Sequence, residues 1–159
     1  MKRQVPLNRQ MTVAQMRPLI DRAVSSGGIF TFTPNGTSML PLLRPGIDSV
    51  ELSAADDAHI GDIVLYQREN GVYVLHRIVS EKDGAFVMCG DNQYKLEYGI
   101  KREQIVALVS AINRDGKHIE RGSEKLKKYE RRLPLMRETK KIKTKTRLFL
   151  SKVKHFFIP

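Results

Sequence analysis

The chain has 159 residues and a hydrophobic content of 41%, which suits one globular domain and excludes gross disorder. Its single cysteine, Cys89, excludes an intramolecular disulfide and a cysteine-based zinc site, and no apolar run is long enough to predict a membrane-spanning helix. The positively charged N-terminus has no apolar stretch behind it, so we expect an unexported protein of the reducing cytoplasm.

The formal net charge of +11 arises in the C-terminal part of the chain. Residues 1–116 contain 13 Lys and Arg and 13 Asp and Glu, whereas residues 117–159 contain 15 and 4. We therefore expect a neutral body, residues 1–122, and a basic tail, residues 123–159, and we interpret the two separately.

A short helix is predicted over residues 12–25. Thr12 begins the pattern, Gln15 stands at capping-box spacing, and apolar residues follow at intervals of three and four. Pro18 either kinks this helix or marks its start, and the run "SSGG" ends it.

Residues 29–120 carry the signals of a β core. The strand-like segments, rich in Val, Ile, Leu, Tyr and Phe, are "IFTF", "SVELS", "DIVLYQ", "VYVLHRIV", "AFVMC" and "IVALVSAI". Asn70-Gly71 gives the strongest hairpin signal, and residues 82–84 and 114–116 are further turns. We expect a mainly β fold: a compact antiparallel, barrel-like or sandwiched sheet with a short N-terminal helix and a basic C-terminal amphipathic helix.

In the tail, Pro134 separates a short helix around residues 123–132 from a longer amphipathic one. The apolar face of the longer helix comprises Ile142, Thr146, Phe149, Leu150, Val153, Phe156 and Phe157. Lysines and arginines lie largely between them, which favours attachment of residues 134–159 to an anionic membrane surface. Nucleic acid is the less favoured partner, because a phosphate tether needs no aromatic side chains.

Ser38 is the candidate nucleophile. It lies in "PNGTSMLPLLRPG", where glycine and prolines restrict the backbone, and a serine becomes reactive only when it is fixed beside a base. Backbone N–H groups in so tight a turn can face an oxyanion, so we take Gly36, Thr37 and Met39 as the oxyanion or substrate loop. The alternative is a surface turn, in which Gly, Ser and Pro are ordinary.

His76 is the candidate base. Strand alternation places it on the face of Val74 and Ile78, and a half-buried imidazole there is either a general base or a core residue with its hydrogen bonds satisfied. Asp91 and Glu97 follow in "MCGDNQYKLEYG", and either can orient the imidazole as the acid does in a Ser-His-acid triad. Asp91 alone is also compatible with an Asx-type turn.

In this order, "GTSMLPLLRPG", "GDIVLY", "YVLHRIV" and "GDNQ" resemble the signal peptidase I and SOS-repressor (LexA-like) clan of serine peptidases, over residues 29–112. The resemblance implies that Ser38 is the nucleophile. It implies that His76, followed by Arg, is the base, as in the endoplasmic-reticulum and spore-former type of signal peptidase, and that Asp91 is the acid of the G-D-N motif. Glu97 stands where that type has a second aspartate.

The resemblance implies an endopeptidase that cleaves a peptide or protein precursor, bound as an extended strand with small side chains near the cut, with no cofactor or metal. Gly36 stands where many signal peptidases have a serine, and their transmembrane anchors have no counterpart here. We therefore expect processing in the cytoplasm or at the inner face of the membrane. The alternatives are a non-catalytic peptide-binding module and a repressor-like self-cleaving regulator. The latter is disfavoured because residues 1–37 are too short for a helix-turn-helix domain and no Ala-Gly pair precedes Ser38.

Overall fold

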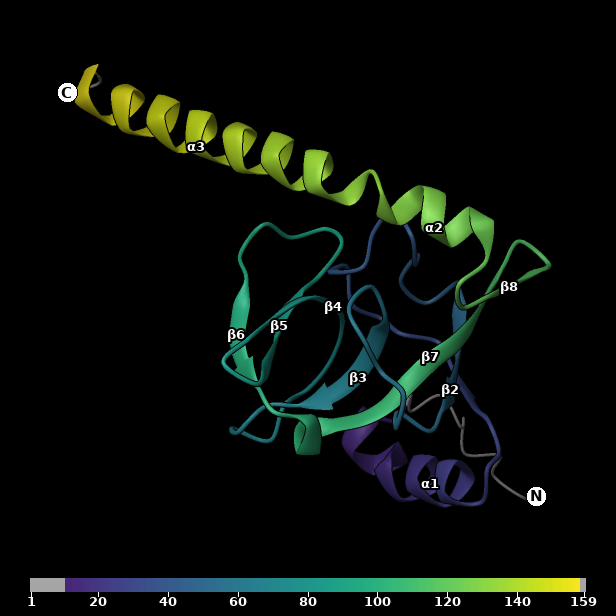
Figure 1. Ribbon diagram of the computed structural model, residues 1–159. Helices are drawn as coiled ribbons and strands as arrows, with labels where there is room; N and C mark the ends of the chain where they lie inside the picture. The colour runs from purple at the N-terminus through teal and green to yellow at the C-terminus, as the bar shows by residue number, and fades with distance from the viewer. Residues whose placement is uncertain (1–10, 158–159) are drawn as a thin grey trace, which may run out of the picture.

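The computed structural model describes residues 11–157, with side chains placed as far as Leu148 in the last helix (Figure 1). The elements in chain order are α1 (Val13–Ser25), β1 (Phe30–Phe32), β2 (Ser49–Ser53), β3 (Ile63–Gln67), β4 (Tyr73–Lys82), β5 (Ala85–Cys89), β6 (Glu97–Ile100), the 3₁₀ turn η1 (Arg102–Gln104), β7 (Ile105–Arg114), β8 (Lys117–Glu120), α2 (Glu124–Glu130) and α3 (Leu133–Phe157). The fold is mainly antiparallel β with an N-terminal and a C-terminal helix, as the sequence predicts.

The strands form one antiparallel sheet in the order β1-β2-β7-β3-β4-β5-β6, with β8 added through β7. Within residues 11–157 no ladder joins β1 to β6, so the sheet is not closed into a barrel, and the barrel-like form is not found. Two separate hydrophobic clusters cover its faces instead of one enclosed interior.

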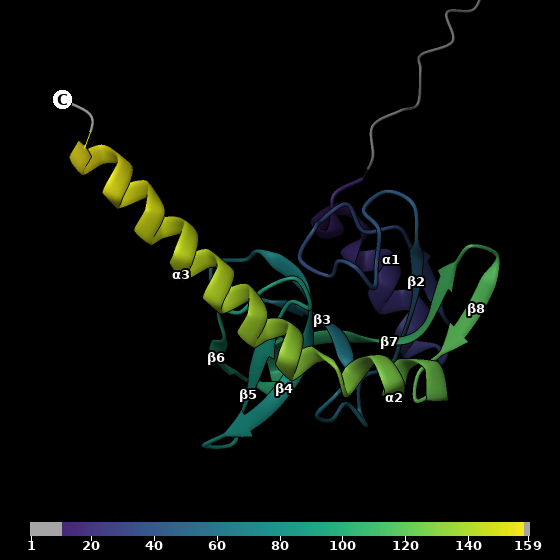
Figure 2. The ribbon, with the colours of Figure 1, turned by 90° about the horizontal axis from the view of Figure 1, so that it is seen from above.

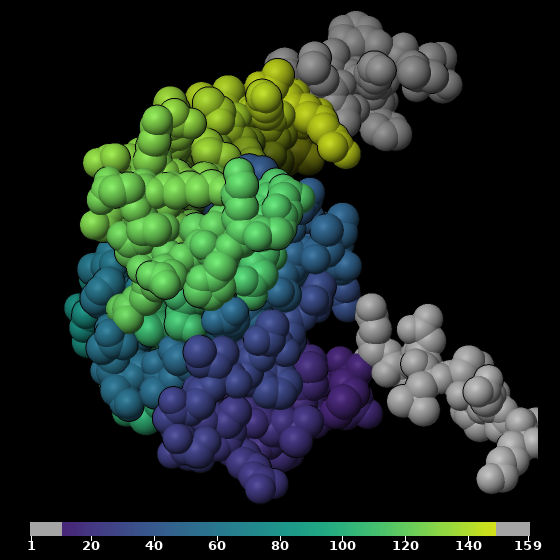
Figure 3. Space-filling view, turned by 90° about the vertical axis from the view of Figure 1, so that its right-hand side faces the viewer, coloured from purple at the N-terminus to yellow at the C-terminus, as the bar shows by residue number. Residues whose placement is uncertain are grey.

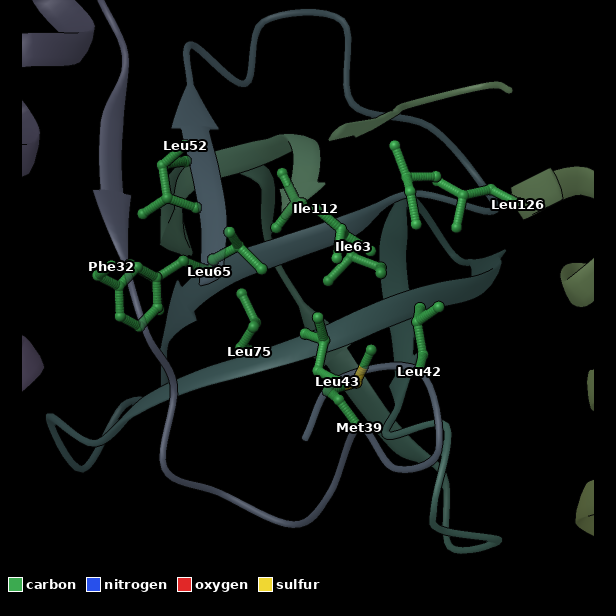
Figure 4. Close-up of a cluster of buried hydrophobic side chains, with 14 of the residues drawn as sticks. Phe32, Met39, Leu42, Leu43, Leu52, Ile63, Leu65, Leu75, Ile112 and Leu126 are labelled. Carbon is green, nitrogen blue, oxygen red and sulfur yellow. The ribbon is translucent and has the colours of Figure 1, made fainter. Parts of the chain in front are cut away.

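The larger cluster contains side chains from α1, from strands β1 to β4, β7 and β8, and from α2, which contributes Leu126. Figure 4 shows many of these side chains. The smaller cluster lies over β3, β4, β5 and β6. Successive residues of β3 alternate between them: Ile63 and Leu65 belong to the larger cluster, and Val64 and Tyr66 belong to the smaller one. This strand is therefore buried on both faces, which explains its continuous apolar sequence.

The capping box predicted for α1 is present. The Thr12 hydroxyl accepts a hydrogen bond from the backbone of Gln15, whose side chain accepts one from the backbone of Thr12. The helix begins at Val13 and includes Pro18, so the proline does not mark its start. Ile20 is fully buried and fixes the helix to the larger cluster.

The C-terminal helices lie at the end of the molecule opposite α1 (Figures 1 and 3). Helix α3 begins at Leu133, has Pro134 in its first turn, and extends past the edge of the sheet (Figure 2). In the part of the chain that the structure describes, no helix is both long and apolar enough to cross a membrane. The side chains predicted for the far apolar face, at Phe149, Leu150, Val153, Phe156 and Phe157, lie outside the described residues.

Candidate active site

The loop between β1 and β2 carries Ser38 and is anchored by three apolar side chains. Met39, Leu42 and Leu43 are buried in the larger cluster (Figure 4). Burying such a side chain stabilises the folded state by about 1.5–3 kcal/mol. The loop is therefore held by packing as well as by its prolines, and the serine occupies a fixed place.

The loop between β5 and β6 clamps the serine loop. The backbone N–H of Asn92 donates to the Ser38 carbonyl at 2.7 Å, and the Asn92 side-chain amide donates to the Thr37 carbonyl at 3.0 Å. Two residues earlier, a Cβ built on Gly90 would lie 2.6 Å from the Ser38 carbonyl oxygen and 3.1 Å from His76 Nε2. The main chain of Ser38 and the imidazole therefore approach the same face of this glycine.

His76 lies on β4 and is only 4% exposed. Its Nδ1 is 3.3 Å from the hydroxyl of Tyr66, while its Nε2 faces Gly90. Burial lowers the pKa of His76 to about 4, because the charged imidazolium loses its hydration there, and the negative charge of Glu97 offsets only part of this effect. At neutral pH the ring is uncharged and can accept a proton, and its low pKa makes it a weaker base than an imidazole in water.

Glu97, at the start of β6, is held by two residues. Arg68 donates from Nε and Nη2 to the two carboxylate oxygens at 2.7 and 2.6 Å, and the Tyr66 hydroxyl donates to Oε2 at 2.8 Å. The hydrogen bonds from Arg68, and then that from Tyr66, hold the pKa of Glu97 below its usual value despite partial burial. The carboxylate is thus ionised, and the Tyr66 hydroxyl lies between it and His76.

Asp91 is fully buried beside Arg77, which donates from Nε and Nη2 to its two carboxylate oxygens at 2.9 and 2.8 Å. Arg77 also donates to the Gly61 carbonyl at 2.6 Å and to Glu130 of α2 at 3.0 Å. This pair fixes the chain immediately before Asn92 and so supports the clamp on the serine loop. Between described residues, no hydrogen bond joins the carboxylate of Asp91 to the imidazole.

A cavity of about 200 Å³ lies beside Ser38. Gly36 and Met39, two of the residues predicted for the substrate loop, line it together with apolar side chains such as Phe32. Thr37 is exposed and does not line the cavity, and its carbonyl accepts the hydrogen bond from the Asn92 side chain.

Tyr66 and Arg68 were not predicted for the site. The signal that could have found them is the hairpin register, in which Val64 pairs with His76 and Tyr66 pairs with Val74. Tyr66 is therefore a diagonal neighbour of His76 on the same face of the sheet. This register leaves three residues, 69–71, in the turn, whereas a two-residue Asn-Gly turn at 70–71 would shift the pairing by one residue, so the turn signal alone does not fix it.

A wider cleft of about 700 Å³ separates the β5–β6 loop from α3. Lys140 of α3 lines it and donates to the side-chain oxygen of Asn92 at 2.6 Å, which links the helix to the clamp on the serine loop. Among the described residues, no group of three His, Cys, Asp or Glu side chains is placed to hold a metal ion.

Comparison with known proteins does not assign the chain to a family. No model of a known protein family matches the sequence, and no curated protein matches it. The fold and the site together define an antiparallel β protein with an anchored serine loop and a buried, uncharged histidine. The main chain of Ser38 and the ring of His76 both lie close to Gly90.

Proposed function

We propose that the protein is a serine endopeptidase, similar to the signal peptidase I and LexA-like clan, that cleaves a peptide or protein precursor. The observation that carries this proposal is the approach of the Ser38 main chain and His76 Nε2 to the same face of Gly90. An uncharged imidazole supplies the base, and the loop that carries the Ser38 hydroxyl is anchored beside it, although among the described residues no hydrogen bond joins Ser38 Oγ to the imidazole.

In the proposed reaction, Ser38 Oγ forms a bond to the peptide carbonyl carbon while its proton passes to His76 Nε2. The backbone N–H of Ser38 stabilises the resulting oxyanion. The C–N bond then breaks, and the imidazolium returns the proton to the leaving amine. Water, deprotonated by the same nitrogen, hydrolyses the acyl-enzyme and restores the Ser38 hydroxyl.

The cavity beside Ser38 supports a preference for a small apolar side chain next to the cleaved bond. Its volume of about 200 Å³ and its lining by residues such as Phe32 and Met39 suit an aliphatic group and not a long charged one. A precursor of an exported or modified peptide, met in the cytoplasm or at the inner face of the membrane, fits this preference and the expected location.

A fluorophosphonate probe tests the proposal, because it forms a covalent bond only with an activated serine. We expect labelling of the wild type and of Ser25→Ala, an exposed control, and none of Ser38→Ala. His76→Ala should label at least about 100-fold more slowly. Labelling of Ser38→Ala at the wild-type rate would refute the site, and an unlabelled wild type that still binds peptides would favour the non-catalytic module.

Mass spectrometry distinguishes our proposal from the alternative of a self-cleaving regulator. Because we propose cleavage of another chain, the intact protein should keep one unchanged mass after mild alkaline incubation. Fragments that appear in the wild type and are absent from Ser38→Ala would instead support the regulator.

We further propose that α3 attaches the protein to an anionic membrane surface. From residue 141 to Leu148 the helix is exposed or partly exposed, it extends past the sheet (Figure 2), and Ile142, the first residue of the predicted apolar face, is exposed. Cations stand along the same segment: Lys141, Lys143, Lys145 and Arg147. A helix with both features lies in the interface with its apolar face toward the lipid.

Cosedimentation with liposomes tests this attachment. Each cation near an anionic surface contributes about 1 kcal/mol, so replacing Lys141, Lys145 and Arg147 by Gln should weaken binding about 100-fold. The control replaces the exposed Lys125 and Lys128 of α2 by Gln and should bind nearly as the wild type. Equal affinity for neutral and anionic liposomes, or for DNA and anionic liposomes, would contradict the proposal.

A further inference from the structure

Three side chains form a hydrogen-bonded chain that ends on the imidazole. Glu97 Oε2 accepts from the Tyr66 hydroxyl at 2.8 Å, and the same hydroxyl lies 3.3 Å from His76 Nδ1. We propose that Tyr66 is a positioning residue that keeps the His76 proton on Nδ1 and the lone pair on Nε2, and that Glu97 acts on the ring through this phenol. The catalytic consequence rests on the proposed function, whereas the protonation pattern does not.

The argument is a count of protons. A tyrosine hydroxyl has one proton to donate, and an ionised carboxylate only accepts. Because Glu97 is ionised, the Tyr66 proton points to Oε2, and the phenol oxygen is then free to accept from His76 Nδ1–H. Nε2 keeps its lone pair and lies beside Gly90. This is the form a general base requires.

The opposite form of the ring costs a hydrogen bond. If Nε2 carried the proton, Nδ1 would need to accept from Tyr66, and the phenol oxygen would face Glu97 Oε2 at 2.8 Å with no proton between them. Tyr66 is fully buried, so no solvent replaces the lost bond. The buried geometry therefore selects one protonation pattern.

The surroundings of the chain keep its charges fixed. Burial, followed by the hydrogen bond to Glu97, raises the pKa of Tyr66, so the phenol is protonated at neutral pH. Arg68, two residues after Tyr66, holds Glu97 through two hydrogen bonds. Asp91, the other nearby carboxylate, is paired with Arg77 and does not compete for the ring.

The direct test needs no substrate. In the full chain labelled with ¹⁵N-histidine, NMR at neutral pH should show a pyrrole-like nitrogen at His76 Nδ1 and a pyridine-like nitrogen at Nε2. The signals are assigned by their absence from His76→Gln. A pyridine-like Nδ1 in the wild type would overturn the proposal whether or not the protein is a peptidase.

Variants test the role of the phenol. Tyr66→Phe removes only the hydroxyl, so we expect a mixture of the two ring forms and a fluorophosphonate labelling rate about 10- to 100-fold lower. Tyr98→Phe, on the same strand as Glu97 but 61% exposed, is the control and should match the wild type. An unchanged ring spectrum and labelling rate in Tyr66→Phe would overturn the proposal.

A double variant tests whether Glu97 acts through Tyr66. The amide of Glu97→Gln can donate a hydrogen bond to the Tyr66 oxygen, so that the Tyr66 O–H turns toward His76 Nδ1. This variant should therefore also change which ring nitrogen of His76 carries the proton. If the two residues act as one unit, Tyr66→Phe combined with Glu97→Gln should label no more slowly than the slower single variant. Losses that multiply would show that Glu97 acts independently. A protein with the expected ring spectrum but no labelling would leave this arrangement standing and refute only the peptidase proposal.

Discussion

Gly90→Ala is the smallest change that should disturb the site. The added Cβ would lie 2.6 Å from the Ser38 carbonyl oxygen, closer than real Cβ atoms approach a backbone atom, and 3.1 Å from His76 Nε2. The φ angle of Gly90 is not in the left-handed region, so any effect comes from the missing space and not from backbone strain.

The magnitude follows from two costs. Overpacking by one methyl group typically destabilises by about 1–3 kcal/mol. Movement of the Ser38 carbonyl also weakens its 2.7 Å hydrogen bond from Asn92, which contributes about 1 kcal/mol. We therefore expect Gly90→Ala to lower the free energy of unfolding by about 2–4 kcal/mol, or the Tm by about 5–15 °C.

Urea and thermal unfolding measure the stability, and fluorophosphonate labelling measures the site. A displacement of about 1 Å at the reacting groups should slow labelling about 100-fold. Gly36→Ala is the control for stability: a Cβ there meets nothing within 4 Å, so its free energy of unfolding should stay within about 0.5 kcal/mol of the wild type. If Gly90→Ala has the same free energy of unfolding as Gly36→Ala and is labelled at the wild-type rate, the inferred close approach of the Ser38 carbonyl and His76 to Gly90 is wrong.

Three further predictions concern the buried charges and the tail. Arg77→Met leaves the carboxylate of Asp91 buried without its partner, so it should lower the free energy of unfolding in urea by about 3–5 kcal/mol. The double variant Arg77→Met with Asp91→Asn should recover part of this loss, and a double variant no more stable than Arg77→Met would count against a buried ion pair. The unfolded chain binds a proton at His76 near pH 6.5, whereas the folded protein binds it only near pH 4. The free energy of unfolding should therefore fall by about 3 kcal/mol as the pH drops through this range, and His76→Gln should flatten that slope, whereas an unchanged slope would contradict the burial. Leu126→Ala should destabilise by about 2–5 kcal/mol, because this side chain is 7% exposed in the core, while Leu135→Ala, at 72% exposed, should change little; similar costs would argue against the packing of α2.

Local signals in the sequence predict most of the elements, because caps and turns act within a few residues. The capping box between Thr12 and Gln15 is present, and the turn at residues 70–71 joins β3 to β4. Strands β6 and β8 were not predicted individually. Each has only four residues, and each forms by pairing with a longer neighbour, β5 or β7, which a local pattern does not reveal.

The partners of the two acids could not be predicted from local patterns. Both Asp91 and Glu97 were candidates to orient His76, and the sequence favoured neither. Their observed partners depend on contacts across the sheet: Glu97 meets Tyr66, which lies 31 positions earlier, and Asp91 meets Arg77, which lies 14 positions earlier. Such pairings are set by strand register and packing, so they emerge only once the whole sheet is assembled.

The guanidinium of Arg77 is a junction between parts of the chain that are remote in sequence. It joins the Gly61 carbonyl, Asp91 and, on α2, Glu130, while Leu133 at the start of α3 is buried as well. A fragment cut after β8 would lose the hydrogen bond of Arg77 to Glu130 and the apolar surface that Leu126 and Leu133 bury. Among residues 141–148 none is buried, so substitutions in that segment should change the proposed membrane attachment without lowering the stability of the sheet.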